Sequence, residues 1–274
     1  MTNVNAIIKK IIKEKDEGIK SVDRAIYDLL KELQTQAIAE IKEAAVGTWD
    51  AYHLNQVLTS IEHQIAIFKP RIKSELNEGL NDAWMQGQNI IDKPLLTINI
   101  HTGWYLSTDI LDTLKTFSFF RLDKLTDDAW LNIKSELHLG VIGGKSPAEV
   151  VKAIGRNLTS PSIFGTIANR AEVIAGTEIG RVFSMATQLR MEEAAKHVPG
   201  LKKQWWHAGH PKLPRPTHVA SNGQIVPVDK PFNVGGVKLM FPRAPGAPLG
   251  EVIGCGCDSI PWHDKWGSSE LPKA

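Results

Sequence analysis

The chain has 274 residues, of which 42% are hydrophobic and 23% are charged, and its formal net charge is +2. That length allows one large domain or two ordinary ones, each with its own core. The near-neutral charge argues against a protein that coats nucleic acid, and two cysteines, Cys255 and Cys257, are too few for a disulfide-stapled secreted fold. With no recognisable signal peptide and no apolar run of roughly 18 residues, the sequence predicts a protein made in the cytoplasm that has no membrane span.

Residues 1–93 are predicted to form a long amphipathic helical hairpin. Apolar side chains recur every three or four residues from about Asn5 to Ala45, and again from about Ala51 to Ile90. Pro70 lies inside the second run, so we expect a kink or a break near Phe68. The two helices are expected to pack antiparallel, with both apolar stripes buried in a core.

Residues 94–200 are predicted to be mainly helical. The stretch from Leu95 to Leu106 is rich in β-branched and aromatic residues, which favours a short strand or an extended connector. Ser146 and Glu149 flank Pro147 at the spacing of a helix capping box. Helices are expected at Thr108 to Phe117 (capped by Ser107), at Thr126 to about Leu139, from Pro147 onward, and at about Ile167 to His197.

Residues 201–274 differ in composition from the rest of the chain. Ten of the 15 prolines lie between Pro199 and Pro261, with many glycines and only short apolar runs. This pattern is typical of a small, loop-rich β module. Helices followed by strands predict an α+β fold that is mostly helical, with the N-terminal hairpin, a helical core and the C-terminal β module.

Three sequence blocks in the C-terminal half occur in a fixed order. They are GGKSPAEVVKAI (143–154), RAEVIAGTEIGRVFSMA (170–186), and W-x₈-RPTH-x₄-G-x₂-VPVDKPF (206–232), the last followed by EVIGCGC (251–257). This succession resembles the Mu F-like phage head-morphogenesis family, the minor head proteins of tailed bacteriophages. The matching positions are Thr177-Glu178, Arg215 to His218, Gly223 to Phe232, and Cys255 with Cys257.

The resemblance covers roughly residues 125–260. It implies a structural virion component of the phage head and not an enzyme. Such a protein would associate with the portal protein and other head proteins of the procapsid, and would assist head assembly, DNA packaging or ejection. Residues 94–200 and 201–274 would then be the helical and β-rich parts of one head-morphogenesis domain.

His218, Cys255 and Cys257 are candidate ligands for zinc, because thiolates and imidazoles are good zinc ligands. The alternative is a pair of buried cysteines acting as small apolar side chains, with His218 bonded to a loop carbonyl. The same three residues could serve a metal-dependent nuclease or toxin-like enzyme, which is the main alternative to a structural role. A fourth zinc ligand could come from His207, His210 or His263.

Two further groups of residues suggest interactions. Glu178 and Arg181 are three residues apart in a predicted helix, which favours a structural ion pair. A group of basic residues lies near several tryptophans of the β module and could contact nucleic acid, as in a DNA-binding protein packaged with the genome. The tryptophans could equally build the core of the module. The basic residues are Lys202, Lys203, Lys212 and Arg215, and the tryptophans are Trp205, Trp206, Trp262 and Trp266.

Overall fold

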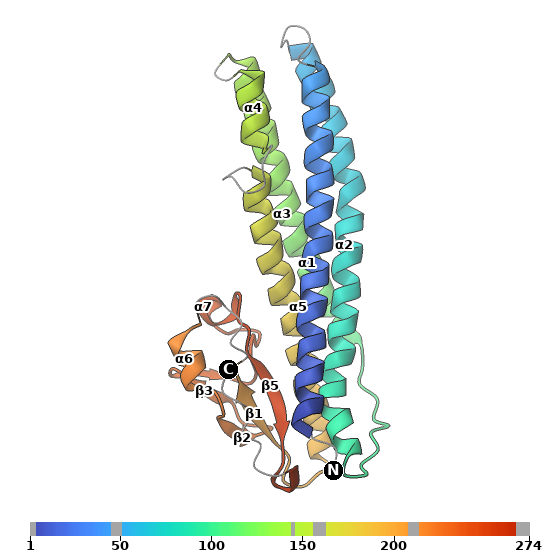
Figure 1. Ribbon diagram of the computed structural model, residues 1–274, viewed down its shortest axis with the longest axis vertical. Helices are drawn as coiled ribbons and strands as arrows, with labels where there is room; N and C mark the ends of the chain where they lie inside the picture. The colour runs from blue at the N-terminus through green and yellow to red at the C-terminus, as the bar shows by residue number, and fades with distance from the viewer. Residues whose placement is uncertain (1–3, 45–50, 144–145, 156–162, 208–213, 267–274) are drawn as a thin grey trace. The chain divides into compact units, whose positions relative to one another are not determined.

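The computed structural model describes residues 4–44, 51–143, 146–155, 163–207 and 214–266 (Figure 1). The fold is mostly helical with a small antiparallel β module towards the C-terminus, which confirms the predicted α+β class. The long helices are α1 (Val4–Ala44), α2 (Ala51–Leu96), α3 (Asp109–Val141) and α5 (Ile163–Ala195), and the shorter ones are α4 (Pro147–Ile154), α6 (Pro216–Ala220), α7 (Leu249–Val252) and the 3₁₀ turn Asp264–Trp266. The strands are β1 (Lys202–Trp206), β2 (Ile225–Pro227), β3 (Phe232–Val234), β4 (Val237–Leu239) and β5 (Asp258–Trp262).

The chain divides into two compact units, and each is built from separate stretches of sequence. One unit, called here the helical unit, comprises Ser21–Asn77 and Thr116–Ala175. The other, called the mixed unit, comprises Met1–Lys20, Glu78–Lys115 and Gly176–Ala274, and contains all of the described strands. Neither unit is a continuous run of sequence.

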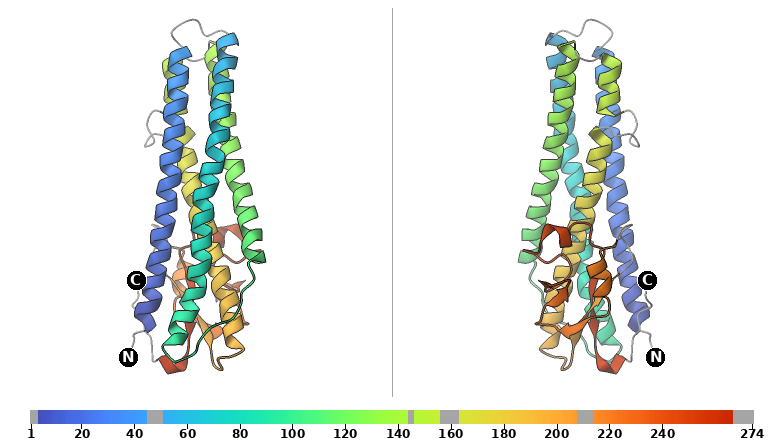
Figure 2. Two further views of the ribbon diagram at one scale, coloured as in Figure 1. Left: turned by 90° about the vertical axis from the view of Figure 1, so that its right-hand side faces the viewer. Right: turned by 90° about the vertical axis from the view of Figure 1, so that its left-hand side faces the viewer.

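In the helical unit, α1 and α2 pack antiparallel, as predicted. Arg71 donates hydrogen bonds to Glu32, and Gln64 donates to Glu40, so residue numbers rise along α1 as they fall along α2. Figure 1 and the left view of Figure 2 show the two helices side by side. The apolar stripes are buried at this contact, as Ile41 and Ile61 illustrate, each with none of its surface exposed.

Of the predicted kink or break near Phe68, the break is wrong, because α2 is continuous from Ala51 to Leu96. Phe68 and Ile72, on either side of Pro70, are both buried. Packing of this apolar face holds the backbone helical on both sides of the proline, and it offsets the missing hydrogen-bond donor.

Two predicted helices are in fact one, α3, because the segment between Phe117 and Thr126 is also helical. Leu122 and Leu125 in that segment are buried and continue the apolar stripe through it. The stretch from Leu95 to Leu106 contains no strand: α2 runs on to Leu96, and an extended connector leads to α3.

The predicted capping box before α4 is confirmed. The Ser146 hydroxyl accepts a hydrogen bond from the Glu149 backbone, and the Glu149 carboxylate accepts one from the Ser146 backbone. These two bonds satisfy amide donors that have no partner inside the helix. The local sequence therefore determines where α4 begins.

In the mixed unit, α2 and α5 approach closely at Gly87. A Cβ atom at Gly87 would lie 2.5 Å from the Phe183 carbonyl oxygen and 2.7 Å from the Ala186 Cβ, so only glycine fits. Arg190 of α5 forms an ion pair with Asp92 of α2, with Nε–Oδ1 at 2.7 Å. These contacts make the two helices a close-packed base for the β module of the same unit.

The β module has a three-stranded antiparallel sheet in the order β2-β1-β5 and a β3–β4 hairpin. Gly235 and Gly236 form the hairpin turn with φ values of 58° and 90°, which favour glycine. Trp205 packs edge-on against Phe232, with ring centroids 5.3 Å apart, and both side chains are fully buried. Cys255 and Cys257 pack into the same apolar cluster and belong to the core of the module.

Among the described residues, none of the helices is both long and apolar enough to span a bilayer.

Candidate metal centre

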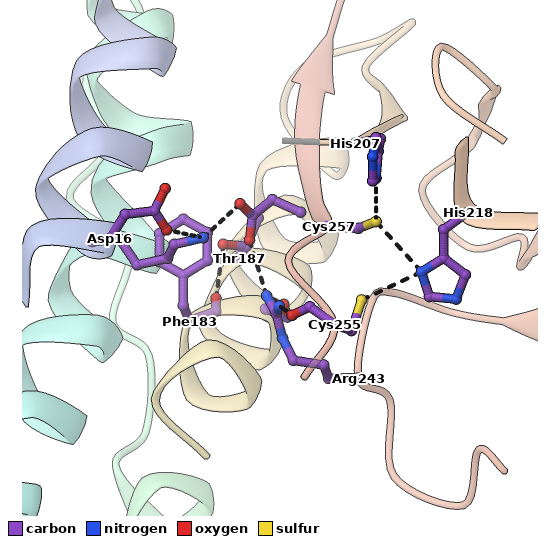
Figure 3. Close-up of polar contacts among 11 residues, drawn as sticks. Asp16, Phe183, Thr187, His207, His218, Arg243, Cys255 and Cys257 are labelled. Atoms are coloured by element: carbon purple, nitrogen blue, oxygen red, sulfur yellow. Dashed lines mark hydrogen bonds and ion pairs between the residues drawn. The ribbon is translucent and has the colours of Figure 1, made fainter. Parts of the chain in front are cut away.

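His218, Cys255 and Cys257 form one buried cluster, as the sequence predicts. The two cysteines lie in the turn that precedes β5, and His218 lies on α6. His218 Nδ1 is 3.5 Å from each of the two sulfur atoms, and all three potential ligand atoms lie within 4.8 Å of one another (Figure 3). None of the three side chains is more than 6% exposed. The group could therefore hold a metal ion.

The spacing of these atoms fits a tetrahedral ion with thiolate and imidazole ligands. Zinc–sulfur bonds of about 2.3 Å and zinc–nitrogen bonds of about 2.0 Å place sulfur and nitrogen ligands ~3.5 Å apart at tetrahedral angles. The two distances from His218 Nδ1 to sulfur have this value. The same distances suit hydrogen bonds between His218 Nδ1 and the two sulfur atoms.

His207 lies beside the cluster, just after β1. Its Nδ1 is 3.3 Å from Cys257 Sγ, and its backbone N–H donates to the Asn222 side chain at 2.9 Å. His263 is engaged elsewhere: Nε2 is 3.1 Å from the Pro199 carbonyl, and Nδ1 accepts from the Lys265 backbone. Of the three candidates for a fourth ligand, His207 is thus beside the cysteines, His263 is not, and His210 is outside the described residues.

The two thiols share one negative charge. The hydrogen bond from Cys257 is the largest influence on Cys255, and together with His218 and Arg243 it outweighs burial and lowers the pKa of Cys255 to about 4. The pKa of Cys257 is raised, because its thiol donates to Cys255 and is buried. Burial lowers the pKa of His218, but interactions with Cys255 and Glu251 outweigh it, so that pKa is raised above its usual value. These shifts favour a Cys255 thiolate beside a protonated His218, with the Cys257 thiol donating to Cys255.

Glu251 fixes the other nitrogen of His218. The Nε2–Oε2 distance is 2.6 Å, so Nδ1 faces the sulfur atoms. The sequence suggested a loop carbonyl as the partner of His218, but the structure has the Glu251 carboxylate in that position. A carboxylate behind a histidine orients the ring and raises its basicity when the histidine binds a metal.

Arg243 supports the cysteine turn from the opposite side. Its guanidinium donates to the Cys255 carbonyl, to the Ser184 hydroxyl at 3.0 Å and to Asp258 at 2.9 Å. Gly180 of α5 leaves room for it, since a Cβ there would lie 2.8 Å from Arg243 Cζ. Asp258 also accepts a hydrogen bond from Lys15 of α1 at 2.6 Å. The turn is therefore tied to α1 and α5 within the mixed unit.

The Thr-Glu motif of α5 lies against the same turn. Thr177 Oγ1 accepts a hydrogen bond from the Gly254 backbone N–H at 3.2 Å. Glu178 and Arg181 form the predicted ion pair, and Arg181 Nε also donates to the Arg243 carbonyl at 3.4 Å. Both side chains of the pair are buried. The motif residues thus position the loop that carries the cysteines.

One of the four predicted nucleic-acid contacts is contradicted by the structure. Lys203 is fully buried, and its Nζ donates to Gln188 Oε1 and to the Met240 carbonyl, so its assignment as a nucleic-acid contact is wrong. β-strand alternation places its side chain inward. Lys202 lies over the Trp262 ring, Arg215 donates to the Ile253 carbonyl at 2.7 Å, and Lys212 is outside the described residues.

The sequence reasoning missed Arg243, Asp258, Lys15 and Glu251. Each belongs to a pair whose members are far apart in the chain, and Lys15 and Asp258 are separated by 243 positions. Helical periodicity and local spacing carry no signal for such pairs. Lys15 would have been noticed only as a charged residue on the apolar face of an amphipathic helix.

The chain is similar to two curated proteins. It is 34% identical over 140 residues to the NAD(+)--arginine ADP-ribosyltransferase EFV of Enterococcus faecalis, an alignment that covers 51% of this chain and 27% of that protein. It is 32% identical over 91 residues to the uncharacterized protein YqbB of Bacillus subtilis, which covers 32% of this chain and 30% of that protein. The chain therefore spans less than a third of either relative. No protein-family model and no solved structure matches it.

Proposed function

We propose that this chain is a minor head protein of a tailed bacteriophage that associates with the portal and the procapsid and has a structural role. The observation that carries the proposal is that the residues of the family resemblance, separated in sequence, meet at one buried place. Thr177 bonds the turn that leads to Cys255, and His218 bonds both cysteines. Such convergence is expected if the sequence blocks are parts of one domain.

A structural role also agrees with the burial of the cluster. A catalytic metal site keeps an open position for water or substrate, whereas a structural site is closed by protein ligands. His218, Cys255 and Cys257 are all buried and pack with Trp205 and Phe232. We therefore propose that the cluster binds zinc, which would hold the β module together. The same burial argues against the nuclease or toxin-like enzyme built on these residues.

Co-expression of the full chain with the portal protein from the same locus tests the proposal. Size exclusion followed by native mass spectrometry should show co-migration at a fixed ratio, and a portal protein from an unrelated phage is the control. A Cys255→Ser, Cys257→Ser double variant should lose co-migration only if the β module takes part in the contact. Separation of the two proteins at low salt would count against the head-assembly role.

The similarity to EFV favours a second candidate, an arginine ADP-ribosyltransferase. The alignment covers a minor part of that protein, so it is equally compatible with a shared module that is not the transferase. Incubation with labelled NAD⁺ and free arginine distinguishes the two. Transfer of label to arginine by an activity that co-purifies with the folded chain would favour the enzyme. Transfer no greater than that of a heat-denatured control would favour the shared module.

A DNA-binding protein packaged with the genome is the third candidate. The burial of Lys203 removes one of its four predicted contacts. Binding that weakens steeply with salt would support the candidate, because phosphate contacts release counterions. Weak binding that is insensitive to salt would argue against it.

A further inference from the structure

We propose that His207 is the fourth protein ligand of the metal centre, so that the site is a closed Cys₂His₂ zinc site with Glu251 positioning one of its histidines. This inference rests on the proposed zinc binding by His218, Cys255 and Cys257. It specifies which side chain completes the tetrahedron and which nitrogen of each ring faces the ion. It also specifies the role of the metal, because a site closed by four protein ligands is structural.

Position is the first argument for His207. Its Nδ1 lies 3.3 Å from Cys257 Sγ, close to the separation of ~3.5 Å expected between sulfur and nitrogen ligands on one ion. Figure 3 shows the His207 ring on the far side of the Cys257 sulfur from His218. The hydrogen bond from its backbone N–H to Asn222 holds the main chain at this position. The proposed site requires the His207 ring to turn towards Cys255 and His218, because the ligand atoms that already lie within 4.8 Å of one another are those of His218, Cys255 and Cys257.

The surroundings of His207 are the second argument. The side chain is 7% exposed, and its ring has a sulfur atom as its hydrogen-bonding neighbour. A buried imidazole needs a polar partner, and the partner of His207 Nδ1 is Cys257 Sγ, which is itself a proposed ligand of the ion. His263, the other histidine of the described β module that was considered as a ligand, already uses both nitrogens on backbone groups.

Glu251 acts through His218. It accepts from Nε2 at 2.6 Å, which leaves Nδ1 as the nitrogen that faces Cys255 and Cys257. A carboxylate in this position fixes the ring orientation of a metal-bound histidine, and its loss commonly weakens metal affinity by about 10- to 100-fold. Glu251 is thus a positioning residue and not a ligand.

X-ray absorption on the zinc-loaded full chain tests the coordination directly. The expected spectrum has two sulfur and two imidazole nitrogen neighbours, with one zinc per chain by elemental analysis. Two sulfurs, one imidazole and one oxygen would overturn the assignment of a closed site. This measurement uses the unaltered chain, so it decides the question even if variants fail to fold.

Variants assign the individual residues through zinc affinity, measured by competition with a chromophoric chelator. His207→Ala should lose one imidazole from the spectrum and weaken affinity by at least about tenfold, while His263→Ala should change neither. Glu251→Gln should weaken affinity but keep two sulfurs and two imidazoles. His210→Ala is included because that residue is a rival ligand, and loss of an imidazole there instead of at His207 overturns the inference.

The outcomes separate this inference from the proposal on which it rests. A wild-type chain that binds no zinc overturns both. A chain that binds one zinc through His218, Cys255 and Cys257, with unchanged affinity in His207→Ala, overturns only the assignment of the fourth ligand. The head-assembly role is tested separately by co-migration with the portal protein.

Discussion

Lys15 and Asp258 form a buried ion pair, with Nζ 2.6 Å from Oδ2, although the two residues come from α1 and β5. Asp258 also pairs with Arg243, so one carboxylate contacts two buried cations, and Lys15 has Asp16 as a second partner at 3.2 Å. Removing one member of a buried ionic network leaves uncompensated charge, which costs more than the net stability of the intact network. Asp258 is therefore expected to be the most sensitive position of this network.

Asp258→Asn should lower the free energy of unfolding by about 3–5 kcal/mol, because buried Lys15 and Arg243 both lose the carboxylate that they share, and Lys15 keeps only Asp16 at 3.2 Å. Urea denaturation measures the change. The control is Glu32→Gln at the exposed pair with Arg71, where less than about 1 kcal/mol should be lost. Equal effects of the two substitutions would show that the Asp258 network is not buried in solution.

Gly87→Ala should destabilise the chain by about 1–3 kcal/mol, because the added methyl group collides with the Phe183 carbonyl and the Ala186 side chain. Gly18→Ala is the matched control, since it lies in α1 and its added methyl group meets no atom within 4 Å. That substitution should stabilise by about 0.5–1 kcal/mol through helix propensity. Thermal melts of both variants decide the matter, and a neutral Gly87→Ala would contradict the close approach of α2 and α5.

Asp23 makes the stability of the helical unit dependent on pH. Burial, and secondarily the charge of Glu172, raise the pKa of Asp23 to about 7 from its usual 3.8. The folded state then holds the proton more tightly than the unfolded state. Stability is therefore highest below about pH 4 as far as this group is concerned, and it falls as the pH rises from about 4 to about 7.

Asp23→Asn should remove that dependence. The variant should be more stable than the wild type at pH 8, by on the order of 1–2 kcal/mol, and close to it at pH 4. Denaturation at the two pH values measures the difference. Asp28→Asn, at an exposed position of the same helix, is the control and should leave the pH profile unchanged. A wild-type stability that does not fall between pH 4 and 7, or that falls equally in Asp23→Asn, would argue against the raised pKa of Asp23.

Lys203→Met should reduce stability and leave any DNA affinity unchanged. The substitution removes the bonds to Gln188 and the Met240 carbonyl, and an unsatisfied buried acceptor costs about 1–3 kcal/mol. Lys202→Ala, on the neighbouring position of β1, is the comparison. Fluorescence anisotropy with duplex DNA at low salt separates the two effects. A loss of DNA affinity at Lys203 alone would mean that its side chain is accessible.

Local sequence pattern accounts for much of the helical part of the fold. Periodic apolar residues predict α1, α2 and α5, and the Ser146–Glu149 box predicts the start of α4. The unbroken course of α2 through Pro70 was not predictable, because it depends on packing partners elsewhere in the chain.

The residues of the candidate metal centre also fall into two groups, those that the sequence predicts and those that only the fold brings to the site. His218, Cys255 and Cys257 are visible in the sequence because their residue types are chemically distinctive. The burial of Lys203 follows from its strand position and from a partner on α5, neither of which composition reveals. Arg243 is a single arginine in a proline-rich loop, and only the fold brings it to Ser184 and Asp258.

The discontinuous make-up of the mixed unit has a consequence for the order of folding during synthesis. Ser21–Asn77 and Thr116–Ala175 leave the ribosome before the segment from Gly176 onward, so the helical unit can form while the mixed unit still lacks its β strands. Until Asp258 emerges, Lys15 lacks its buried partner and has only the neighbouring Asp16 as a carboxylate contact. Proteolysis of nascent chains stalled near Ala195 should therefore cleave the first turns of α1 and spare Ser21–Asn77. In this order of folding, the turn that carries the two cysteines packs against α1 and α5 only after the helical unit has formed.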